Sequence, residues 1–432
     1  MILVDTALAR REDEGNPVRV GLVGAGRVAR AAALQILNST PGMRLCVIAN
    51  RTTGRAREIW AECDYEDIRD VDTLRALDQA IDQGAGVVSA DHRLLSQSEQ
   101  IDVILEVTGA TAFGAEVALA AIDGGKHFVT MSAELDSLLG PILRKKAKDA
   151  GVVYTVTEGD QPGVELNLYR WVKTLGLTPL VCGNIKGMID FYRTPETQAA
   201  FAKQWGQDPY MVTSFADGTK VSQEQAVVAN ATGMCVGQRG MYGPEHREQI
   251  DSLTSFYDVD ELKALGGVVD YALGSEPSPG VYVFASQPDT RIAEMLHYAK
   301  MGEGPLYSFY IPYHLFHLEV PISVARAALF GDTVVASDGP IRVEVVSLAK
   351  RDLKAGETLD GIGGFCAYGV CENAWVSKPE RLLPIGLADG CVLTRDVAKD
   401  QAITLDDVTF PDGRLIDRLR AEQDAVFEVP KR

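Results

Sequence analysis

The sequence predicts an α/β protein that begins with a doubly wound parallel sheet, continues into an α+β region and ends in a β-rich region. Three observations predict this order. Residues 1–155 alternate short apolar runs with helical segments, which is the pattern of a parallel sheet covered by helices on both faces. A glycine-rich turn follows the first apolar run. From residue 156 longer helices dominate, and the C-terminal part holds short β runs separated by glycines.

The first region is expected to contain five strands and three helices. Pro41-Gly42 ends the first helix and Gly124-Gly125 ends the second, because glycine and proline are common C-terminal helix signals. We assign no strand to the charged stretch 64–99. The expected strands are 18–23, 45–49, 101–107, 128–131 and 152–156, and the expected helices are 29–37, 113–122 and 141–150.

The remaining chain predicts two further regions. Helices are expected at 162–175, 197–205 and 222–231, with a strand at 281–285. The last region carries β runs at 343–348, 392–393 and 403–404 and around Thr358 and Val370, and few helices. We therefore expect a dinucleotide-binding domain at 1–155, an α+β catalytic and oligomerisation domain at 156–335, and a β domain at 336–432.

Composition narrows the classes of function. The 432 residues hold 42 Lys and Arg against 60 Asp and Glu, a net charge of −18, which disfavours nucleic acid as a partner because phosphate binding needs a basic face. No apolar run reaches the length of a membrane span, and the N-terminus does not resemble a signal peptide. The seven cysteines form no CxxC pair, so we expect reduced thiols and a cytoplasmic protein.

A glycine loop predicts a dinucleotide cofactor. In the segment VGLVGAGRVA, Gly24, Gly26 and Ala29 match the GxGxxA fingerprint of a Rossmann fold. The first glycine allows a tight turn, the second a close approach of the pyrophosphate, and the small third residue close packing of helix and strand. A glycine-rich turn without ligand is the alternative. The predicted cofactor contacts of this loop are Gly21, Gly24, Gly26, Arg27 and Val28.

The end of the second strand favours NADPH over NADH. An NAD enzyme usually has an acid here for the ribose 2′-hydroxyl, whereas this chain has Asn50 and Arg51. Arg51 is expected to bind a 2′-phosphate, unless it is a solvated loop residue. Further cofactor contacts are expected where other strands end, because ligands bind at the carboxyl edge of parallel sheets. These are Thr108, Gly109 and Ser132.

Three clusters are candidates for substrate chemistry. Glu158 and Asp160 follow the strand at 152–156 and can transfer protons or bind a metal, although Asp160 can equally cap the next helix. Lys186 lies between glycines at a strand end, where it can hold a phosphate or carboxylate, or be an ordinary surface lysine.

The third cluster is Asp217, Lys220 and Glu224. Their spacing places them on one face if the segment is helical, which suits a pocket wall. A solvated helix start with a salt bridge is the alternative. His314 and His317 lie in an aromatic-rich segment and are interpreted as core or interface histidines.

Together these segments resemble known proteins. The N-terminal fingerprint, the segment 183–187 and the helix within 217–230 resemble the homoserine dehydrogenase-like oxidoreductases. The segment KAGETL at 354–359 is similar to the SAF (antifreeze-like, β-clip) domain. The combination resembles the DXR-like reductoisomerases. That resemblance implies conversion of 1-deoxy-D-xylulose 5-phosphate to 2-C-methyl-D-erythritol 4-phosphate with NADPH, a step of isoprenoid biosynthesis.

The chain departs from homoserine dehydrogenases at two lysines of their site. Glu134 follows the strand at 128–131 where those enzymes have one lysine, and Glu224 stands near the position of their catalytic lysine. Acids there better suit a divalent metal, Mg²⁺ or Mn²⁺, or the hydroxyl groups of a polyol. No metal ligand set can be assigned.

The leading prediction is therefore an NADPH-dependent reductoisomerase acting on a phosphorylated or polyhydroxylated small molecule. Lys186 and Lys220 would hold the aldehyde, and Glu224, Asp217 and Glu158 would serve a metal or proton transfer. The first alternative is an NAD(P)-dependent dehydrogenase of another polyol, a sugar acid or a homoserine-like substrate. A non-catalytic nucleotide sensor is the second. We expect a homodimer or homotetramer.

Overall fold

The computed structural model describes residues 3–335 and 339–431, which belong to two compact units. Unit 1 comprises Met1–Leu135, Leu139–Asp160 and Leu315–Asp338. Unit 2 comprises Asp136–Leu138, Gln161–His314 and Gly339–Arg432. The predicted domain boundary between residues 335 and 336 adjoins residues 336–338, which lie outside the described residues. The division into three domains stays a prediction.

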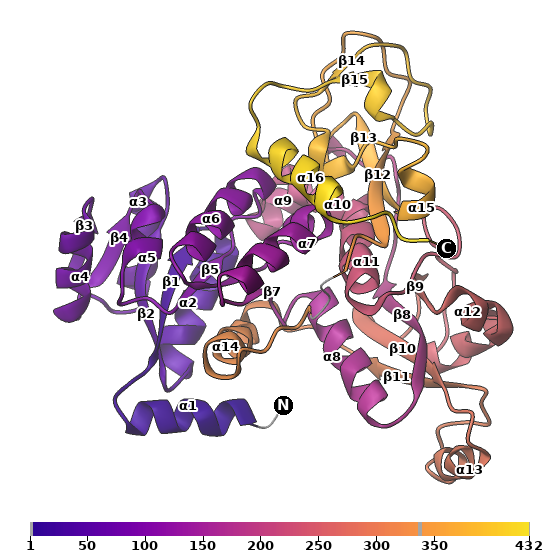
Figure 1. Cartoon of the computed structure of the whole chain (residues 1–432), viewed down its shortest axis with the longest axis horizontal. Helices are drawn as coiled ribbons and strands as arrows, with labels where there is room; N and C mark the ends of the chain where they lie inside the picture. Colours follow the sequence, from indigo (N-terminus) through magenta and orange to yellow (C-terminus); the bar gives the residue numbers. More distant parts are fainter. Residues whose placement is uncertain (1–2, 336–338, 432) are drawn as a thin grey trace. The chain divides into compact units, whose positions relative to one another are not determined.

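Unit 1 alternates strands and helices along the chain, as its apolar runs predict (Figure 1). After unit 2 the chain returns to unit 1 for three short helical elements. In chain order the elements are α1 Leu3–Asp13, β1 Val18–Val23, α2 Arg27–Ser39, β2 Met43–Ala49, α3 Thr53–Glu62, β3 Ile68–Val71, α4 Leu74–Asp82, β4 Gly86–Ser89, α5 Arg93–Gln97, β5 Val103–Glu106, α6 Thr111–Asp123, β6 His127–Thr130, α7 Ala133–Asp149, β7 Tyr154–Val156, η2 Phe316–Leu318, α14 Val320–Ala325 and the π-helix η3 Arg326–Phe330.

The seven strands form one parallel sheet in the order β3-β4-β2-β1-β5-β6-β7. The chain moves outward on one side of β1 through β2, and then crosses to the other side for β5. This reversal next to β1 is the place where open parallel sheets bind ligands, at the carboxyl ends of the strands. The predicted doubly wound Rossmann-like sheet is confirmed.

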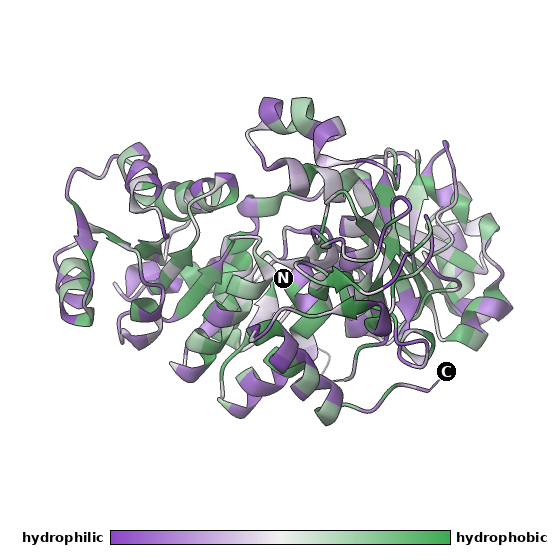
Figure 2. Ribbon diagram, turned by 90° about the horizontal axis from the view of Figure 1, so that it is seen from above, coloured by the Kyte–Doolittle hydropathy of each residue, from purple (hydrophilic) through white to green (hydrophobic). Residues whose placement is uncertain are grey.

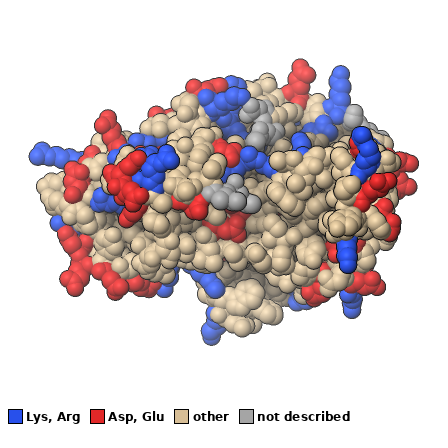
Figure 3. Space-filling view, turned by 90° about the horizontal axis from the view of Figure 1, so that it is seen from below, with Lys and Arg blue, Asp and Glu red and all other residues tan. Residues whose placement is uncertain are grey.

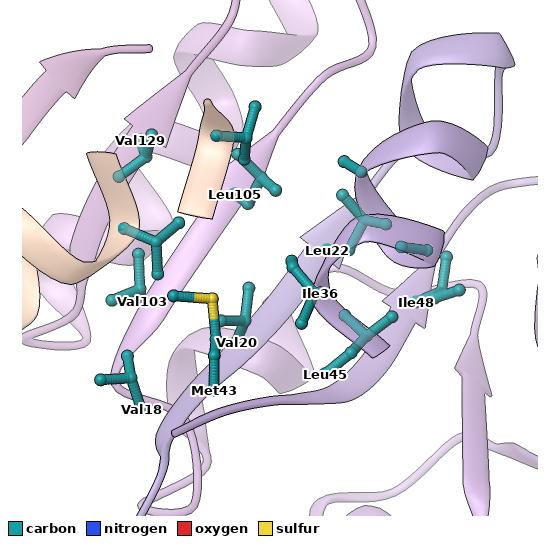
Figure 4. Packing of buried hydrophobic residues seen from close by; sticks show 14 of the residues in the cluster. Val18, Val20, Leu22, Ile36, Met43, Leu45, Ile48, Val103, Leu105 and Val129 are labelled. Atoms are coloured by element: carbon teal, nitrogen blue, oxygen red, sulfur yellow. The ribbon is translucent and has the colours of Figure 1, made fainter. Parts of the chain in front are cut away.

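The core of unit 1 forms because its central strands are apolar on both faces. Val20, Leu22, Leu45 and Val103 are at most 2% exposed, and Ile36 of α2 packs with them. Figure 4 shows these side chains meeting across β1, β2 and β5. In Figure 2 the strands are mostly green, while the helices carry both colours. This contrast is expected when helices cover a sheet and expose one face to water.

Several elements of unit 1 escaped the sequence analysis, namely α1, α3, β3, α4, β4, α5 and the returning elements η2, α14 and η3. The charged stretch 64–99 contains β3 and β4, which are four residues long and therefore show little periodicity. Helix α1 buries only Val4 and Leu8, so its apolar face is narrow. The stretch 64–99, to which the sequence analysis assigned no element, therefore adds two strands to the sheet.

Unit 2 combines helices with three sheets (Figure 1). Its elements are α8 Gln161–Thr174, β8 Thr178–Lys186, α9 Pro195–Trp205, α10 Pro209–Ala216, α11 Thr219–Thr232, η1 Ile250–Phe256, α12 Val259–Leu265, β9 Val268–Leu273, β10 Gly280–Ser286, α13 Thr290–Tyr298, β11 Leu306–Ile311, β12 Val343–Ala349, β13 Ala367–Asn373, α15 Ala374–Ser377, η4 Ile385–Leu387, β14 Val392–Leu393, η5 Leu405–Asp407, β15 Val408–Thr409 and α16 Leu415–Val426.

A four-stranded mixed sheet, in the order β11-β10-β8-β9, is the centre of unit 2. Strands β8 and β9 are parallel, and β10 runs antiparallel to β8 and β11. Gly183 of β8 pairs with Tyr282 of β10, and a Cβ added at Gly183 would lie 2.2 Å from Tyr282 Cζ. The glycine therefore leaves room for a buried aromatic ring, which gives it a packing reason apart from any ligand.

Helix α11 is buried along nearly its whole length, from Thr219 to Asn230. It packs against α8 and the four-stranded sheet, and the antiparallel pair β12–β13 covers it further. The Gly369 N–H donates to Thr219 Oγ1 at 2.8 Å, and Asn230 Oδ1 accepts from the Val343 N–H at 3.0 Å. The C-terminal strands thus close the helix on the side that the sheet leaves open.

The C-terminal segment is β-rich as predicted, with two differences. Thr358 and Thr404 form isolated bridges, and the segment ends in the helix α16. This helix escaped prediction because two of its four buried side chains, Arg420 and Gln423, are polar. Arg420 forms a buried ion pair with Glu344 of β12, which holds the helix in place. The SAF-like assignment stays a prediction.

Several whole-chain properties complete the description. All seven cysteines are buried and free of disulfide bonds. On the face drawn in Figure 3, acidic and basic side chains are interspersed with uncharged ones. Among the described residues, no helix combines the length and the apolar character that a membrane crossing requires.

Candidate functional site

The fingerprint glycines of unit 1 form a turn at the carboxyl end of β1. Gly24 has a left-handed φ of +121°, which disfavours residues other than glycine. Gly26 caps α2 with extended backbone, and a Cβ built there meets nothing within 4 Å. Ala29 is fully buried against the sheet. The N-terminus of α2 is thus open to an anion such as a pyrophosphate, and this geometry fits a dinucleotide.

The other predicted cofactor residues of this loop have distinct environments. Gly21 lies inside β1, where an added Cβ would approach Leu95 Cδ2 to 3.0 Å, so packing is one reason for that glycine. Arg27 and Val28 form the first turn of α2.

The remaining predicted cofactor residues follow β2, β5 and β6 at the same edge of the sheet. Asn50 Nδ2 donates to Thr52 O at 2.8 Å, and Arg51 is exposed. Thr108 and Gly109 follow β5, and Ser132 caps α7 by accepting the Leu135 N–H at 3.1 Å. The parallel sheet brings all these positions to the edge where the glycine turn lies.

A buried acid that the sequence analysis missed organises this edge. Glu106, the last residue of β5, is 0% exposed and accepts hydrogen bonds from the Thr108 N–H at 2.7 Å and from Thr130 Oγ1 at 2.7 Å. Burial raises the pKa of the Glu106 carboxyl, although these hydrogen bonds oppose the shift. Glu106 therefore ties the loop after β5 to the end of β6. The signal in the sequence is an acid that ends an apolar strand.

Glu158 and Asp160 both lie in unit 1, after β7. Glu158 pairs with the Arg326 guanidinium, and its N–H donates to Ser323 Oγ at 2.8 Å. These contacts fasten the returning segment of the chain to the end of β7. Asp160 is buried directly before α8. A catalytic role for either acid stays a prediction.

In unit 2, Lys186 and Glu224 form an ion pair. Lys186 is the last residue of β8, and its Nζ lies 2.9 Å from Glu224 Oε2 of α11. Asn184 Nδ2 also donates to Glu224 Oε2, at 3.1 Å, and Lys186 donates to Gln161 Oε1. The Lys186 side chain is 21% exposed and that of Glu224 is 4% exposed. Lys186 is therefore the more exposed side chain of this pair.

Asp217 does not share the helix face with Lys220 and Glu224, because α11 begins only at Thr219. Gly218, with a φ of +79°, separates Asp217 from the helix. Asp217 is buried and pairs with Lys350, which follows β12, at 2.7 Å. Its Oδ1 accepts the Thr219 N–H at 2.9 Å, so it fixes the start of α11. Lys220 is buried within the helix. The prediction that all three residues share one helix face is therefore wrong for Asp217, and only Lys220 and Glu224 lie on the helix.

The arrangement of these acids does not fit a divalent metal. Glu224, Asp217 and Glu158 are each paired with a cation, namely Lys186, Lys350 and Arg326. No group of three or more His, Cys, Asp or Glu side chains is placed to share a metal ion among the described residues. The chemistry below is therefore derived without a metal.

A second buried acid in unit 2 was missed by the sequence analysis. Asp270 of β9 accepts from the Gly243 N–H at 2.8 Å and from Tyr257 Oη at 2.8 Å. Burial raises the pKa of Asp270 to about 6. Tyr257 Oη also lies 3.3 Å from Tyr282 Oη, so this acid belongs to a polar network inside the core.

Comparison with known proteins matches two consecutive parts of the chain to described families. Residues 24–157 match the family described as "Homoserine dehydrogenase, NAD binding domain". Residues 159–320 match the family described as "Oxidoreductase DRL, catalytic domain", and this range contains Lys186, Asp217, Lys220 and Glu224. Neither match extends past residue 320.

Among curated proteins, the chain is similar to two homoserine dehydrogenases. It is 24% identical to the Pseudomonas aeruginosa enzyme over 264 residues, 58% of this chain and 55% of that protein. It is 29% identical to the Neisseria gonorrhoeae enzyme over 119 residues, 28% of this chain and 24% of that protein. The chain thus spans about half or less of the length of these relatives.

Solved structures show only distant likeness. A probable dehydrogenase from Thermotoga maritima has a TM-score of 0.38 and 14% identity, covering 62% of this chain and 72% of that one. A Lactobacillus casei myo-inositol dehydrogenase, in complex with NAD(H) and myo-inositol, has a TM-score of 0.31 and 19% identity, covering 42% and 49%. The conclusion comes from the two family matches: the chain combines a homoserine dehydrogenase-like NAD-binding domain with an oxidoreductase catalytic domain.

Proposed function

We propose that this protein is an NAD(P)-dependent dehydrogenase that interconverts a hydroxyl and a carbonyl group on a small polar substrate. A polyol, a sugar acid or a homoserine-like compound is the substrate class. The observation that carries the proposal is the Lys186–Glu224 pair, at 2.9 Å, within the part of the chain that matches an oxidoreductase catalytic domain. The open glycine turn of unit 1 supports a nicotinamide dinucleotide as the cofactor.

Reduction of a carbonyl group needs a proton in addition to the hydride, and the Lys186–Glu224 pair supplies the proton donor. The bound cofactor supplies or accepts the hydride. The carbonyl oxygen must then gain a proton during reduction, and the Lys186 ammonium is a positioned donor for it. Glu224 balances the charge of Lys186 before transfer, and Asn184 and Gln161 orient the two groups. Helix α11 carries Glu224. Asp217 fixes the first turn of this helix through the Thr219 N–H, and Lys220 packs within that turn.

We further propose that the cofactor is NADP(H). Arg51 is exposed directly after β2, where an acid would bind the ribose 2′-hydroxyl of NAD. A guanidinium group can form two parallel hydrogen bonds with a 2′-phosphate. Asn50 adds no negative charge that would repel that phosphate.

The dehydrogenase proposal is broader than the reductoisomerase that the resemblance of the sequence implies. The matching family descriptions name a homoserine dehydrogenase domain and an oxidoreductase, and neither names a reductoisomerase. The comparisons therefore favour the broader reaction. The conversion of 1-deoxy-D-xylulose 5-phosphate, the SAF-like identity of the C-terminal region and a homodimer or homotetramer remain narrower proposals.

One experiment tests these proposals together. NADPH and NADH absorbance is followed with the purified protein in the presence of aldehydes and ketones derived from homoserine, polyols and sugar acids, and of 1-deoxy-D-xylulose 5-phosphate. Each reaction is run with Mg²⁺, with Mn²⁺ and with a chelator. Turnover of a non-rearranging substrate in chelator supports the proposal. Turnover of 1-deoxy-D-xylulose 5-phosphate alone would replace it with the reductoisomerase reaction.

The role of Lys186 is tested on the same substrate. Lys186→Ala should lower turnover by about 10²–10⁴-fold with dinucleotide affinity unchanged, because a positioned proton donor contributes on that scale. Lys203→Ala is the matched control, since Lys203 is an exposed lysine of α9 in the same unit. Equal turnover of both variants would exclude Lys186 as the proton donor.

A further inference from the structure

A second carboxyl group lies beside the Lys186–Glu224 pair. Glu165 of α8 is 0% exposed, and Gln225 Nε2 of α11 donates to its Oε2 at 2.9 Å. Glu165 Oε1 has no hydrogen-bond partner among the described residues, and neither has Gln225 Oε1. Two acceptor atoms of one bonded pair are thus buried without a donor, which is costly unless a proton lies between the two groups.

The charged and titratable groups around Glu165 come from three elements. Burial raises the pKa of Glu165 most, and Glu224 of α11 raises it further, whereas the Gln225 hydrogen bond and Lys186 of β8 lower it. Cys182 of β8 and Tyr282 of β10 also interact with it electrostatically, and burial raises the pKa of each well above its usual range, so both are neutral near neutral pH. Lys186 is the one cation in this set, and it is already paired with Glu224.

We propose that Glu165 is a positioning residue of this site that remains a neutral carboxylic acid, donating its proton to the Gln225 amide and leaving Lys186 paired with Glu224 alone. A neutral Glu165 gives the unpartnered oxygens a donor and adds no second anion beside the Lys186–Glu224 ion pair. An ionised Glu165 would add a second buried anion that competes for Lys186. Burial is the main cause that raises the pKa of Glu165 well above its usual range, in agreement with this arrangement.

The protonation of Glu165 can be tested without turnover, so its failure is distinguishable from failure of the proposed function. Infrared spectra are compared for the full-length protein and Glu165→Gln, which has the shape of the neutral acid and cannot ionise. At pH 7 the wild-type spectrum should contain a neutral-carboxyl band that the variant lacks. If Glu165→Gln does not fold, Glu165→Asp should move the band. Because burial also raises the pKa of Glu106, the readout is the wild-type-minus-variant difference spectrum at pH 7. A difference spectrum without a neutral-carboxyl band would overturn the proposal.

The positioning role rests on the proposed function and has its own readout. Glu165→Gln should retain turnover within about 3-fold at pH 7, where both side chains are neutral. Its pH profile of kcat should differ from that of the wild type on the alkaline side, because wild-type Glu165 can ionise there and the glutamine cannot. Superimposable pH profiles would overturn the positioning role while leaving the infrared result intact.

Discussion

The ion pair between Lys350 and Asp217 gives a quantitative test of how the C-terminal strands support the candidate site. Lys350 is 2% exposed in its side chain and Asp217 is 0% exposed. Lys350 Nζ also donates to Arg193 O and Gly364 O, each at 2.7 Å. The perturbation is Lys350→Met, which keeps the length of the side chain and removes its charge and its donors.

The expected loss follows from what remains after the substitution. Removing one partner of a buried ion pair costs about 3–5 kcal/mol, because the other charge stays buried without compensation. Burial already raises the pKa of Asp217, so this carboxyl can take up a proton and relieve part of the cost. We therefore expect a loss near the lower end, about 3 kcal/mol at pH 7, and a smaller loss at lower pH. The double variant Lys350→Met/Asp217→Asn should recover part of it.

The assay is chemical denaturation followed by circular dichroism, with hydrogen exchange of α11 to locate the change. Lys354→Met is the matched control, since Lys354 pairs with Asp396 on the surface, where the two side chains are 70% and 58% exposed. Exposed pairs contribute little to stability, so this variant should behave as wild type. If Lys350→Met unfolds at the same denaturant concentration as Lys354→Met, the pair does not hold the start of α11.

Two further predictions concern the cofactor and the core. Arg51→Ala should weaken NADPH binding by about 1.5–3 kcal/mol, the scale of a charged hydrogen bond, and leave NADH binding unchanged in a calorimetric titration; an equal loss for both cofactors would contradict the NADP(H) proposal. Burial raises the pKa of Asp270 to about 6, so the folded protein favours the protonated carboxyl. The stability that this protonated form contributes is fully present below about pH 4, the pKa of the group in the unfolded chain, and is lost as the pH rises through 6. Asp270→Asn should therefore gain thermal stability relative to wild type between pH 4.5 and pH 7, and a constant difference across that range would refute the assignment.

The strand–helix alternation of unit 1 was predictable because each of its central strands is a continuous apolar run. The position of Lys186 at a strand end was predictable for the same local reason. The wrong prediction that Asp217 lies on the helix could have been avoided from the local sequence, because Asp-Gly at 217–218 is typical of a turn before a helix.

The partners of the buried groups were beyond local reasoning. Glu165 and Glu106 each stand in an apolar stretch, which is a weak sign of a buried acid, but nothing near them in the sequence identifies Gln225 or Thr130 as partners. Lys350 and Asp217 meet only when β12 packs on α11. Such pairs depend on tertiary packing, so they cannot be predicted from the hydrophobic periodicity of the sequence.

The burial of α11 has a consequence for the order in which the protein is made. Residues 219–232 leave the ribosome long before the strands β12 and β13 that cover them. Until those strands are synthesised, the apolar surface of this helix stays uncovered. Folding intermediates with such exposed surface aggregate or bind chaperones. A premature stop codon between residues 233 and 343 would therefore release a chain that contains Lys186, Lys220 and Glu224 and still lacks a finished site.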